Sequence, residues 1–147
     1  MYSNWEWKNY EKLDCNPVIT HEMLPEGSSL EDFRDPKIWI EGEEFYCVVA
    51  SRSNDGSGQI LMYKSNNLKE WEFVAIVDNS KNKVGRMWEC PDLFSLNGKD
   101  VLIISPQEVK ATKDGFHNGN NTAYLIEKYD NEKNSFERES CNVIDFG

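Results

Sequence analysis

The feature that most constrains the fold of this chain is an internal repeat of about 55 residues. Residues 35–39 read Asp-Pro-Lys-Ile-Trp, and residues 90–94, 55 positions later, read Cys-Pro-Asp-Leu-Phe. Each segment is followed by a glycine turn, at Gly42 and at Gly98, and then by an apolar run. The outer parts of the two units also repeat, at a spacing of 65. Units of this length that hold about four strands are typical of β-propeller blades.

Short apolar runs between turn signals predict an all-β chain. The runs are rich in aromatic and β-branched residues, and no segment keeps a helical period. The dipeptide Asn97-Gly98 between two such runs is a strong hairpin signal. The predicted strands are 37–40, 44–51, 59–65, 71–77, 92–96, 100–105, 122–129 and 136–143. Residues 106–121 contain no apolar pattern and predict a long surface loop, which is either a plain connector or a functional element.

The repeat predicts one partial β-propeller domain over residues 1–147. Residues 1–30 are expected to be the end of a preceding blade, residues 31–80 one blade, and residues 81–147 the next. Because a propeller closes with four or more blades, about two blades leave lateral faces exposed. We therefore expect a piece of a larger propeller, and a homo-oligomer that forms through the exposed blade faces. A small β-sandwich with a coincidental repeat is the competing interpretation.

Charge and composition argue against several classes of function. The net charge is −10 over 147 residues, which is a poor match to nucleic acid or to an anionic membrane surface. No apolar run is long enough for a membrane helix, and none at the start has the form of a signal peptide. We therefore expect a cytoplasmic protein that binds neither nucleic acid nor membrane.

The cysteines predict neither a zinc site nor a disulfide framework. Cys15, Cys47, Cys90 and Cys141 are widely spaced, and the chain has only two histidines. A structural zinc site needs closely spaced ligands, and a disulfide scaffold needs a higher cysteine density. We expect free buried thiols, with no metal and no cofactor.

An acidic residue stands at the start of each repeated unit. Arg34 and Asp35 come before one proline, and Glu89 and Cys90 come before the other. Both pairs are expected just ahead of the inner strand of a blade, so that they face one another across the mouth of the central channel. Enzymes that hydrolyse glycosides use two carboxyl groups that converge on a pocket. One of the two must carry a proton for the leaving oxygen. The competing interpretation is that both acids belong to ordinary turns.

The amino-acid sequences of these two motifs resemble those of glycoside hydrolase family 32. Residues 33–39 (Phe-Arg-Asp-Pro-Lys-Ile-Trp) and 87–94 (Met-Trp-Glu-Cys-Pro-Asp-Leu-Phe) resemble two signature motifs of that family. The family contains invertases, sucrose-6-phosphate hydrolases, inulinases and levanases. Residues 60–65 and 68–72 resemble the stretch that lies between these motifs, and residues 103–107 the strand end that follows them. The resemblance implies a five-bladed β-propeller followed by a β-sandwich, of which the first blade and the sandwich are not expected in this chain.

The resemblance also implies a role for five residues. Glu89 is expected to be the general acid/base, and Asp35 to stabilise the transition state at the fructose hydroxyls. Arg34, Cys90 and Trp88 are expected to line the substrate site. The expected substrate is a sucrose-type fructoside, which is sucrose, sucrose 6-phosphate or a fructan.

The nucleophile of the family is an aspartate in an Asn-Asp-Pro-Asn-type motif of the first blade, and this sequence contains no such motif. Since a retaining mechanism needs that residue, we expect the chain to be inactive alone. Two alternatives stay open: an arabinan-cleaving propeller glycosidase, and a non-catalytic sugar-binding or assembly module. In such a module Trp39, Trp88 and Phe116 are surfaces on which sugars stack; otherwise they pack between the blades.

Overall fold

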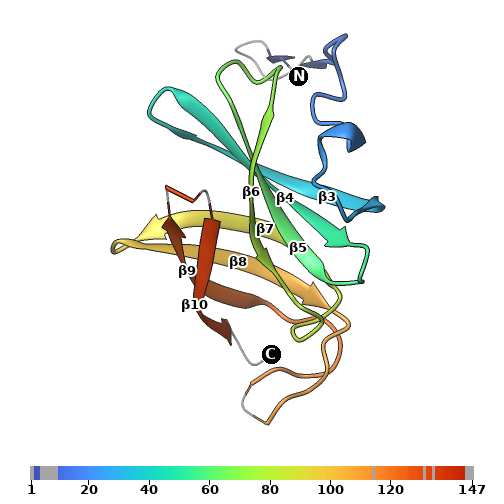
Figure 1. Cartoon of the computed structure of the whole chain (residues 1–147), viewed down its shortest axis with the longest axis vertical. Coiled ribbons are helices and arrows are strands. Elements are labelled where there is room, and N and C mark those ends of the chain that lie inside the picture. The colour runs from blue at the N-terminus through green and yellow to red at the C-terminus, as the bar shows by residue number, and fades with distance from the viewer. Residues whose placement is uncertain (1, 4–9, 114, 131, 134, 145–147) are drawn as a thin grey trace.

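The computed structural model describes residues 2–3, 10–113, 115–130, 132–133 and 135–144. Two four-stranded antiparallel sheets make up most of it (Figure 1). The first sheet contains, in spatial order, β3 (Ser28–Glu41), β4 (Glu44–Ser53), β5 (Gly58–Ser65) and β6 (Glu72–Asn79). The second contains β7 (Met87–Leu96), β8 (Lys99–Gln107), β9 (Ala123–Asp130) and β10 (Ser135–Val143). Two short strands, β1 (Tyr2–Ser3) and β2 (Tyr10–Glu11), and the 3-10 turn η1 (His21–Met23) precede them.

Each sheet is a meander in which strands that follow one another in the sequence also pair in space. This is the arrangement of a propeller blade. The inner hairpins turn at Gly42 and at Asn97-Gly98, as predicted, with positive φ at all three residues. Among the described strands, neither sheet mixes the two repeated units. The prediction of two propeller blades is therefore confirmed, and the β-sandwich interpretation is wrong.

The inner strands begin earlier than the sequence predicts. Sequence reasoning places the Asp-Pro and Cys-Pro pairs ahead of the strands, whereas they lie inside β3 and β7. The pairing register shifts between Arg34 and Lys37 in β3, and between Glu89 and Asp92 in β7. A proline has no N–H to donate to the ladder, so each strand passes through its proline as a β-bulge.

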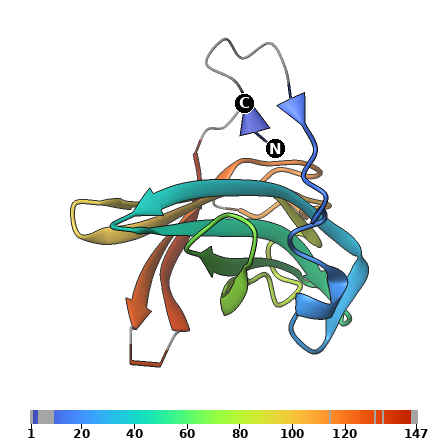
Figure 2. The same ribbon diagram turned by 90° about the horizontal axis from the view of Figure 1, so that it is seen from above.

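A hydrophobic core lies between the two sheets, which are stacked on one another (Figures 1 and 2). Val48 and Ile60 of the first sheet meet Leu102 and Leu125 of the second, together with Trp88, and all five are fully buried. A second cluster covers the opposite face of the first sheet, where residues 18–24 supply apolar side chains. The first blade is thus buried on both faces, while the outer face of the second blade belongs to neither cluster.

A polar cluster joins the outer strands of the two blades. Arg138 on β10 donates to the Asp78 carboxylate on β6, and also to the carbonyl of Asn79 at 2.9 Å. Glu127 on β9 is buried beside this pair. Burial, and then the nearby carboxylate of Asp78, raise the pKa of Glu127 to about 9. At neutral pH Glu127 is therefore an uncharged acid within the interface.

The free thiols do not all lie in the core. Cys47 is buried and Cys141 is half-buried, but Cys15 and Cys90 are exposed. The prediction of buried thiols is wrong for the last two, because Cys90 lies in the bulge of β7 and Cys15 in the segment before η1. Within the described residues, no helix is long and apolar enough to cross a membrane.

Candidate functional site

The two proline bulges lie next to one another, because β3 and β7 are neighbouring inner strands. Three side-chain contacts join equivalent residues that are 55 positions apart: Arg34 with Glu89, Asp35 with Cys90, and Lys37 with Asp92. The constant spacing shows that the two inner strands lie in matched register. The repeat in the sequence is therefore also a set of contacts between neighbouring blades.

Both bulges hold a residue in the left-handed region of the backbone. Asp35 has φ 56° and Cys90 has φ 49°. Residues other than glycine seldom adopt such values, and strained residues of this kind cluster at functional sites. The two motifs at the starts of the repeated units therefore coincide with unusual backbone geometry.

The carboxylate of Glu89 is held through both of its oxygens. Arg34 Nε donates to Oε1 at 3.0 Å, and Gln107 Nε2 donates to Oε2 at 2.6 Å. The Glu89 side chain remains 25% exposed, so a substrate can still reach it. Gln107, at the end of β8, was not among the residues that sequence reasoning selected, because its partner lies 18 positions away on another strand.

The carboxylate of Asp35 is bound to the residue that follows Glu89. The backbone N–H of Cys90 donates to Asp35 Oδ2 at 3.1 Å, and Cys90 Sγ lies 3.8 Å from the same oxygen. Partial desolvation, followed by the charges of Asp35 and Glu89, raises the pKa of the Cys90 thiol. Cys90 is thus a protonated thiol at neutral pH, which makes it a poor nucleophile. The structure therefore brings Asp35, Glu89, Arg34 and Cys90 together.

A further acidic residue, Asp32, contacts Arg34. Asp32 Oδ1 is 3.3 Å from Arg34 Nη2, and Asp32 Oδ2 is 2.5 Å from Arg52 Nη2. Asp32 precedes Arg34 by two residues in β3, which places both side chains on one face of the strand. The spacing of two residues is the only signal in the sequence for the contact between Asp32 and Arg34. Such spacings are too common for sequence reasoning to single out Asp32. The pair of arginines balances the charges of Asp32 and Glu89.

Trp88 is placed differently from the other four predicted site residues. Its side chain is fully buried, and its indole N–H donates to the carbonyl of Val84 at 2.7 Å. Its ring also contacts the Arg138 guanidinium, at 5.5 Å from the ring centre. Because the ring offers no surface to a sugar in this chain, we do not keep Trp88 in the substrate-binding set. Trp39 and Phe116 also pack against the core between the blades, as the packing interpretation predicts.

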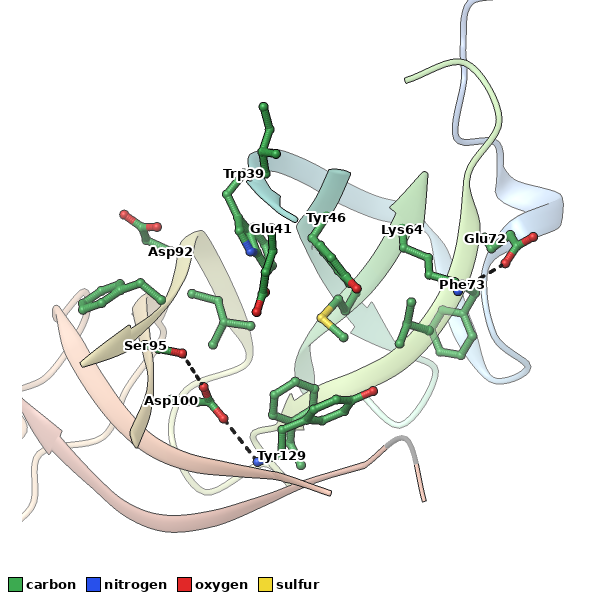
Figure 3. Close-up of a pocket in the computed structure, with 16 residues that line it drawn as sticks. Trp39, Glu41, Tyr46, Lys64, Glu72, Phe73, Asp92, Ser95, Asp100 and Tyr129 are labelled. Atoms are coloured by element: carbon green, nitrogen blue, oxygen red, sulfur yellow. Dashed lines mark hydrogen bonds and ion pairs between the residues drawn. The ribbon is translucent and has the colours of Figure 1, made fainter. Parts of the chain in front are cut away.

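A cavity of about 1020 Å³ opens between the two blades (Figure 3). Trp39 and Tyr46 stack on one wall, and Tyr129 lies against Phe136 on another. Neither Asp35 nor Glu89 lines this cavity. The acid pair that sequence reasoning selected therefore lies outside this cavity. Twisted sheets that diverge from one another leave a wedge of this kind without any ligand.

Two neighbouring propeller blades whose inner strands bring an acid pair together define a class of protein, the propeller glycosidases. Residues 1–147 match the N-terminal domain of glycosyl hydrolases family 32, and the chain belongs to that family.

Among its relatives is the sucrose-6-phosphate hydrolase of Bacillus subtilis, which is 37% identical over 128 residues that cover 84% of this chain and 26% of the relative. The GH32 β-fructofuranosidase of Bombyx mori, solved as a mutant in complex with sucrose, superimposes with a TM-score of 0.82 at 38% identity, over 93% of this chain and 29% of that one. The sucrose-6-phosphate hydrolase of Lactobacillus gasseri superimposes with a TM-score of 0.67 at 27% identity, over 84% and 26% of the two chains. This chain thus spans about a quarter of the length of these relatives.

Proposed function

We propose that this chain is the part of a retaining β-fructofuranosidase that carries the general acid/base Glu89 and the transition-state stabiliser Asp35. The observation that carries the proposal is the contact between the two bulges, in which Asp35 binds the residue next to Glu89. The proposed substrates are sucrose, sucrose 6-phosphate or a fructan. The names of the relatives, sucrose-6-phosphate hydrolase and β-fructofuranosidase, support this substrate class.

In the proposed first step, Glu89 gives its proton to the glycosidic oxygen. The bond between that oxygen and the anomeric carbon breaks, its electron pair stays with the oxygen, and a carboxylate nucleophile attacks the carbon. In the second step Glu89 takes a proton from a water molecule, whose oxygen displaces the carboxylate and releases the sugar. The exposed part of the Glu89 side chain is the route by which the leaving group and the water reach it.

The other residues of the site have separate proposed roles. Asp35 is fixed through Oδ2 by the Cys90 N–H, which orients the carboxylate toward the hydroxyls of the fructosyl ring. Those contacts strengthen as charge develops on the ring, so that they stabilise the transition state. Arg34 compensates the charge of Glu89 when it is ionised, and Arg34 and Cys90 line the substrate site.

The nucleophile is proposed to come from another segment. This sequence contains no Asn-Asp-Pro-Asn-type motif, so the 147-residue chain is proposed not to turn over sucrose by itself. Without that carboxylate the fructosyl carbon is not captured, although Glu89 can still offer a proton.

A chimera tests this proposal. The segment of the Bacillus subtilis sucrose-6-phosphate hydrolase that matches this chain is replaced by the residues of this chain, which supplies the missing nucleophile. Hydrolysis of sucrose and of sucrose 6-phosphate is then measured for the chimera and for the isolated chain. We expect turnover only by the chimera. A folded chimera that cleaves neither sugar contradicts the proposal, and so does rapid hydrolysis by the isolated chain.

A cytoplasmic location is part of the same proposal. Cys15 and Cys90 are exposed free thiols, and such thiols persist in a reducing compartment. Fractionation of cells that express the native gene, with immunodetection of the protein, tests the location.

A further inference from the structure

We infer that Gln107 is a positioning residue for the acid/base Glu89, and that its side-chain amide serves as a hydrogen-bond partner for both protonation states of that carboxyl group. The inference rests on the proposed function, because it assigns a new partner to the same carboxyl group. Gln107 makes the shorter of the two hydrogen bonds to Glu89.

The sheet geometry places Gln107 within reach of Glu89. In the β7–β8 ladder Met87 pairs with Gln107, and Glu89 pairs with Ser105. Directly paired residues point to the same face of a sheet, and so do residues two positions apart on one strand. Gln107 and Glu89 are therefore diagonal neighbours on one face, and the Nε2–Oε2 distance of 2.6 Å follows from that placement.

The backbone of Gln107 is fixed by the turn before β7. Arg86 N donates to the Gln107 carbonyl at 2.9 Å. Gly85 adopts φ 67°, and a Cβ atom at Gly85 would lie only 2.4 Å from the Gln107 carbonyl oxygen. This close approach leaves Gln107 little room to shift. Its side chain is therefore presented to Glu89 from a rigid element, as a positioning role requires.

An amide suits a group that alternates between acid and base. Glu89 is an acceptor at both oxygens when it is ionised, and it becomes a donor when it is protonated. Arg34 can only donate, so it can bind the Oε1 acceptor of Glu89 but cannot accept the proton of the carboxylic acid. Gln107 can donate through Nε2 to the carboxylate, and after a half-turn of its amide it can accept through Oε1 from the carboxylic acid. Gln107 thus keeps the plane of the carboxyl group fixed through the catalytic cycle.

The chain offers a matched control, because its only other glutamine has a structural place. Gln59 is buried, and its Nε2 donates to Ser28 at 3.0 Å and to Ser51 at 3.4 Å. Removal of that amide leaves buried hydroxyl groups without a partner. This loss destabilises the fold but does not act on the catalytic step. The Gln59→Leu variant therefore shows what a purely structural loss does to activity.

The test compares two leaving groups in the chimera described above. The leaving group of sucrose needs a proton, whereas p-nitrophenyl β-D-fructofuranoside releases an anion that is already stable. For Gln107→Leu we expect kcat on sucrose to fall about 10- to 100-fold, while KM stays within about threefold. With the nitrophenyl substrate we expect a loss below about threefold. Gln107→Asn, which keeps the amide, should retain more activity on sucrose than Gln107→Leu.

Each outcome of this comparison separates the inference from the proposed function. Equal losses on both substrates, as expected for Gln59→Leu, or no loss at all, overturn the positioning role of Gln107. An unaltered chimera that cleaves neither substrate contradicts the proposed function instead.

If the unaltered chimera is inactive, the hydrogen bond between Gln107 and Glu89 is tested on the isolated 147-residue chain instead. The side-chain amide protons of Gln107 are followed by NMR in the chain and in its Glu89→Ala variant. We expect the amide signal of Gln107 to move upfield and to exchange faster in the variant, while that of Gln59 stays in place. A Gln107 signal that does not change overturns the inference.

Discussion

Asp35 and Glu89 are not equivalent residues of the repeat, although the motifs invite that interpretation. The residue of the first blade that corresponds to Glu89 is Arg34, and the one that corresponds to Asp35 is Cys90. Each acid thus faces a donor from the neighbouring blade rather than another carboxylate. This one-residue offset avoids the repulsion between like charges that two equivalent acids in contact would suffer.

The separate roles proposed for the two acids predict different effects of mutation in the chimera. Glu89→Gln removes the proton donor, so hydrolysis of sucrose should fall by several orders of magnitude, while cleavage of the nitrophenyl fructoside in the first step should fall much less. Asp35→Asn should lower the rate on both substrates alike, because the proposed role of Asp35 is on the fructosyl ring. Burst-phase and steady-state kinetics with both substrates measure these effects. Equal sensitivity of the two substrates to Glu89→Gln would show that the role of acid is misassigned.

At the scale of elements, the turn that leads into β7 must lie very close to the end of β8. Gly85 and Gly98 both have positive φ, but only Gly85 has a neighbour in the space that a Cβ would occupy, namely the Gln107 carbonyl oxygen at 2.4 Å. Gly98 has nothing within 4 Å. The two glycines therefore separate the cost of backbone strain from the cost of a steric clash.

We predict that Gly85→Ala destabilises the chain more than Gly98→Ala. The strain of a positive φ costs about 1 kcal/mol in both variants, and the clash at Gly85 adds about 2 kcal/mol or more, because backbone must move. Urea denaturation followed by tryptophan fluorescence gives both free energies of unfolding. Equal losses in the two variants would mean that the turn before β7 lies farther from β8 than the structure shows.

The interface between the outer strands predicts a dependence of stability on pH. The pKa of Glu127 is raised to about 9 in the folded chain, from 4.5 for an ordinary glutamate. Between these values the folded state holds a proton that the unfolded state has lost, so stability is greatest below about pH 4.5 for this group and falls as pH rises toward about 9. The slope is at most about 1.4 kcal/mol per pH unit.

Glu127→Gln keeps the shape and the hydrogen-bonding capacity of the side chain but removes its charge. We expect this variant to be more stable than the parent at pH 8 and similar to it at pH 4, by urea denaturation at each pH. Glu137→Gln, which changes an exposed residue of β10, is the matched control and should leave the slope unchanged. A parent and a Glu127→Gln variant with parallel pH profiles would contradict the placement of Glu127 in the interface.

At the scale of the whole molecule, the two blades are not covered to the same extent. Leu102 and Leu125 point toward the first blade, so their strand neighbours Val101 and Ile126 lie on the opposite face of the second sheet. Leu96, which is 55% exposed, extends this apolar face along β7. Apolar side chains on an uncovered face of this kind favour association.

We predict that the isolated chain associates through this face as its concentration rises. The double variant Leu96→Lys with Ile126→Lys should shift the sedimentation velocity profile toward monomer, because both changes place charge within the buried contact. Leu30→Lys is the control, since Leu30 is 70% exposed on the other sheet. A parent chain that remains monomeric at every concentration, or a control that dissociates as readily as the double variant, would show that the face is not a contact surface.

The sequence by itself determined the two blades, because each blade is built from consecutive segments of the chain. Its strands follow one another in the chain, and its turns depend on short-range backbone preferences such as those of Gly42 and Gly98. The sequence also determined the family, because the motifs at 33–39 and 87–94 are contiguous. The limits of β3 and β7 could not be predicted in the same way, since a proline indicates the end of a strand unless a bulge accommodates it.

Only the tertiary structure decided which groups meet. Whether Arg34 or Asp35 faces Glu89 depends on the relative register of two strands in different blades, and the two bulges set that register. Whether Gln107 reaches Glu89 depends on the pairing within the second sheet, and the burial of Trp88 depends on how the two sheets stack. Each of these contacts joins segments that are distant along the chain and that only the folded arrangement brings together.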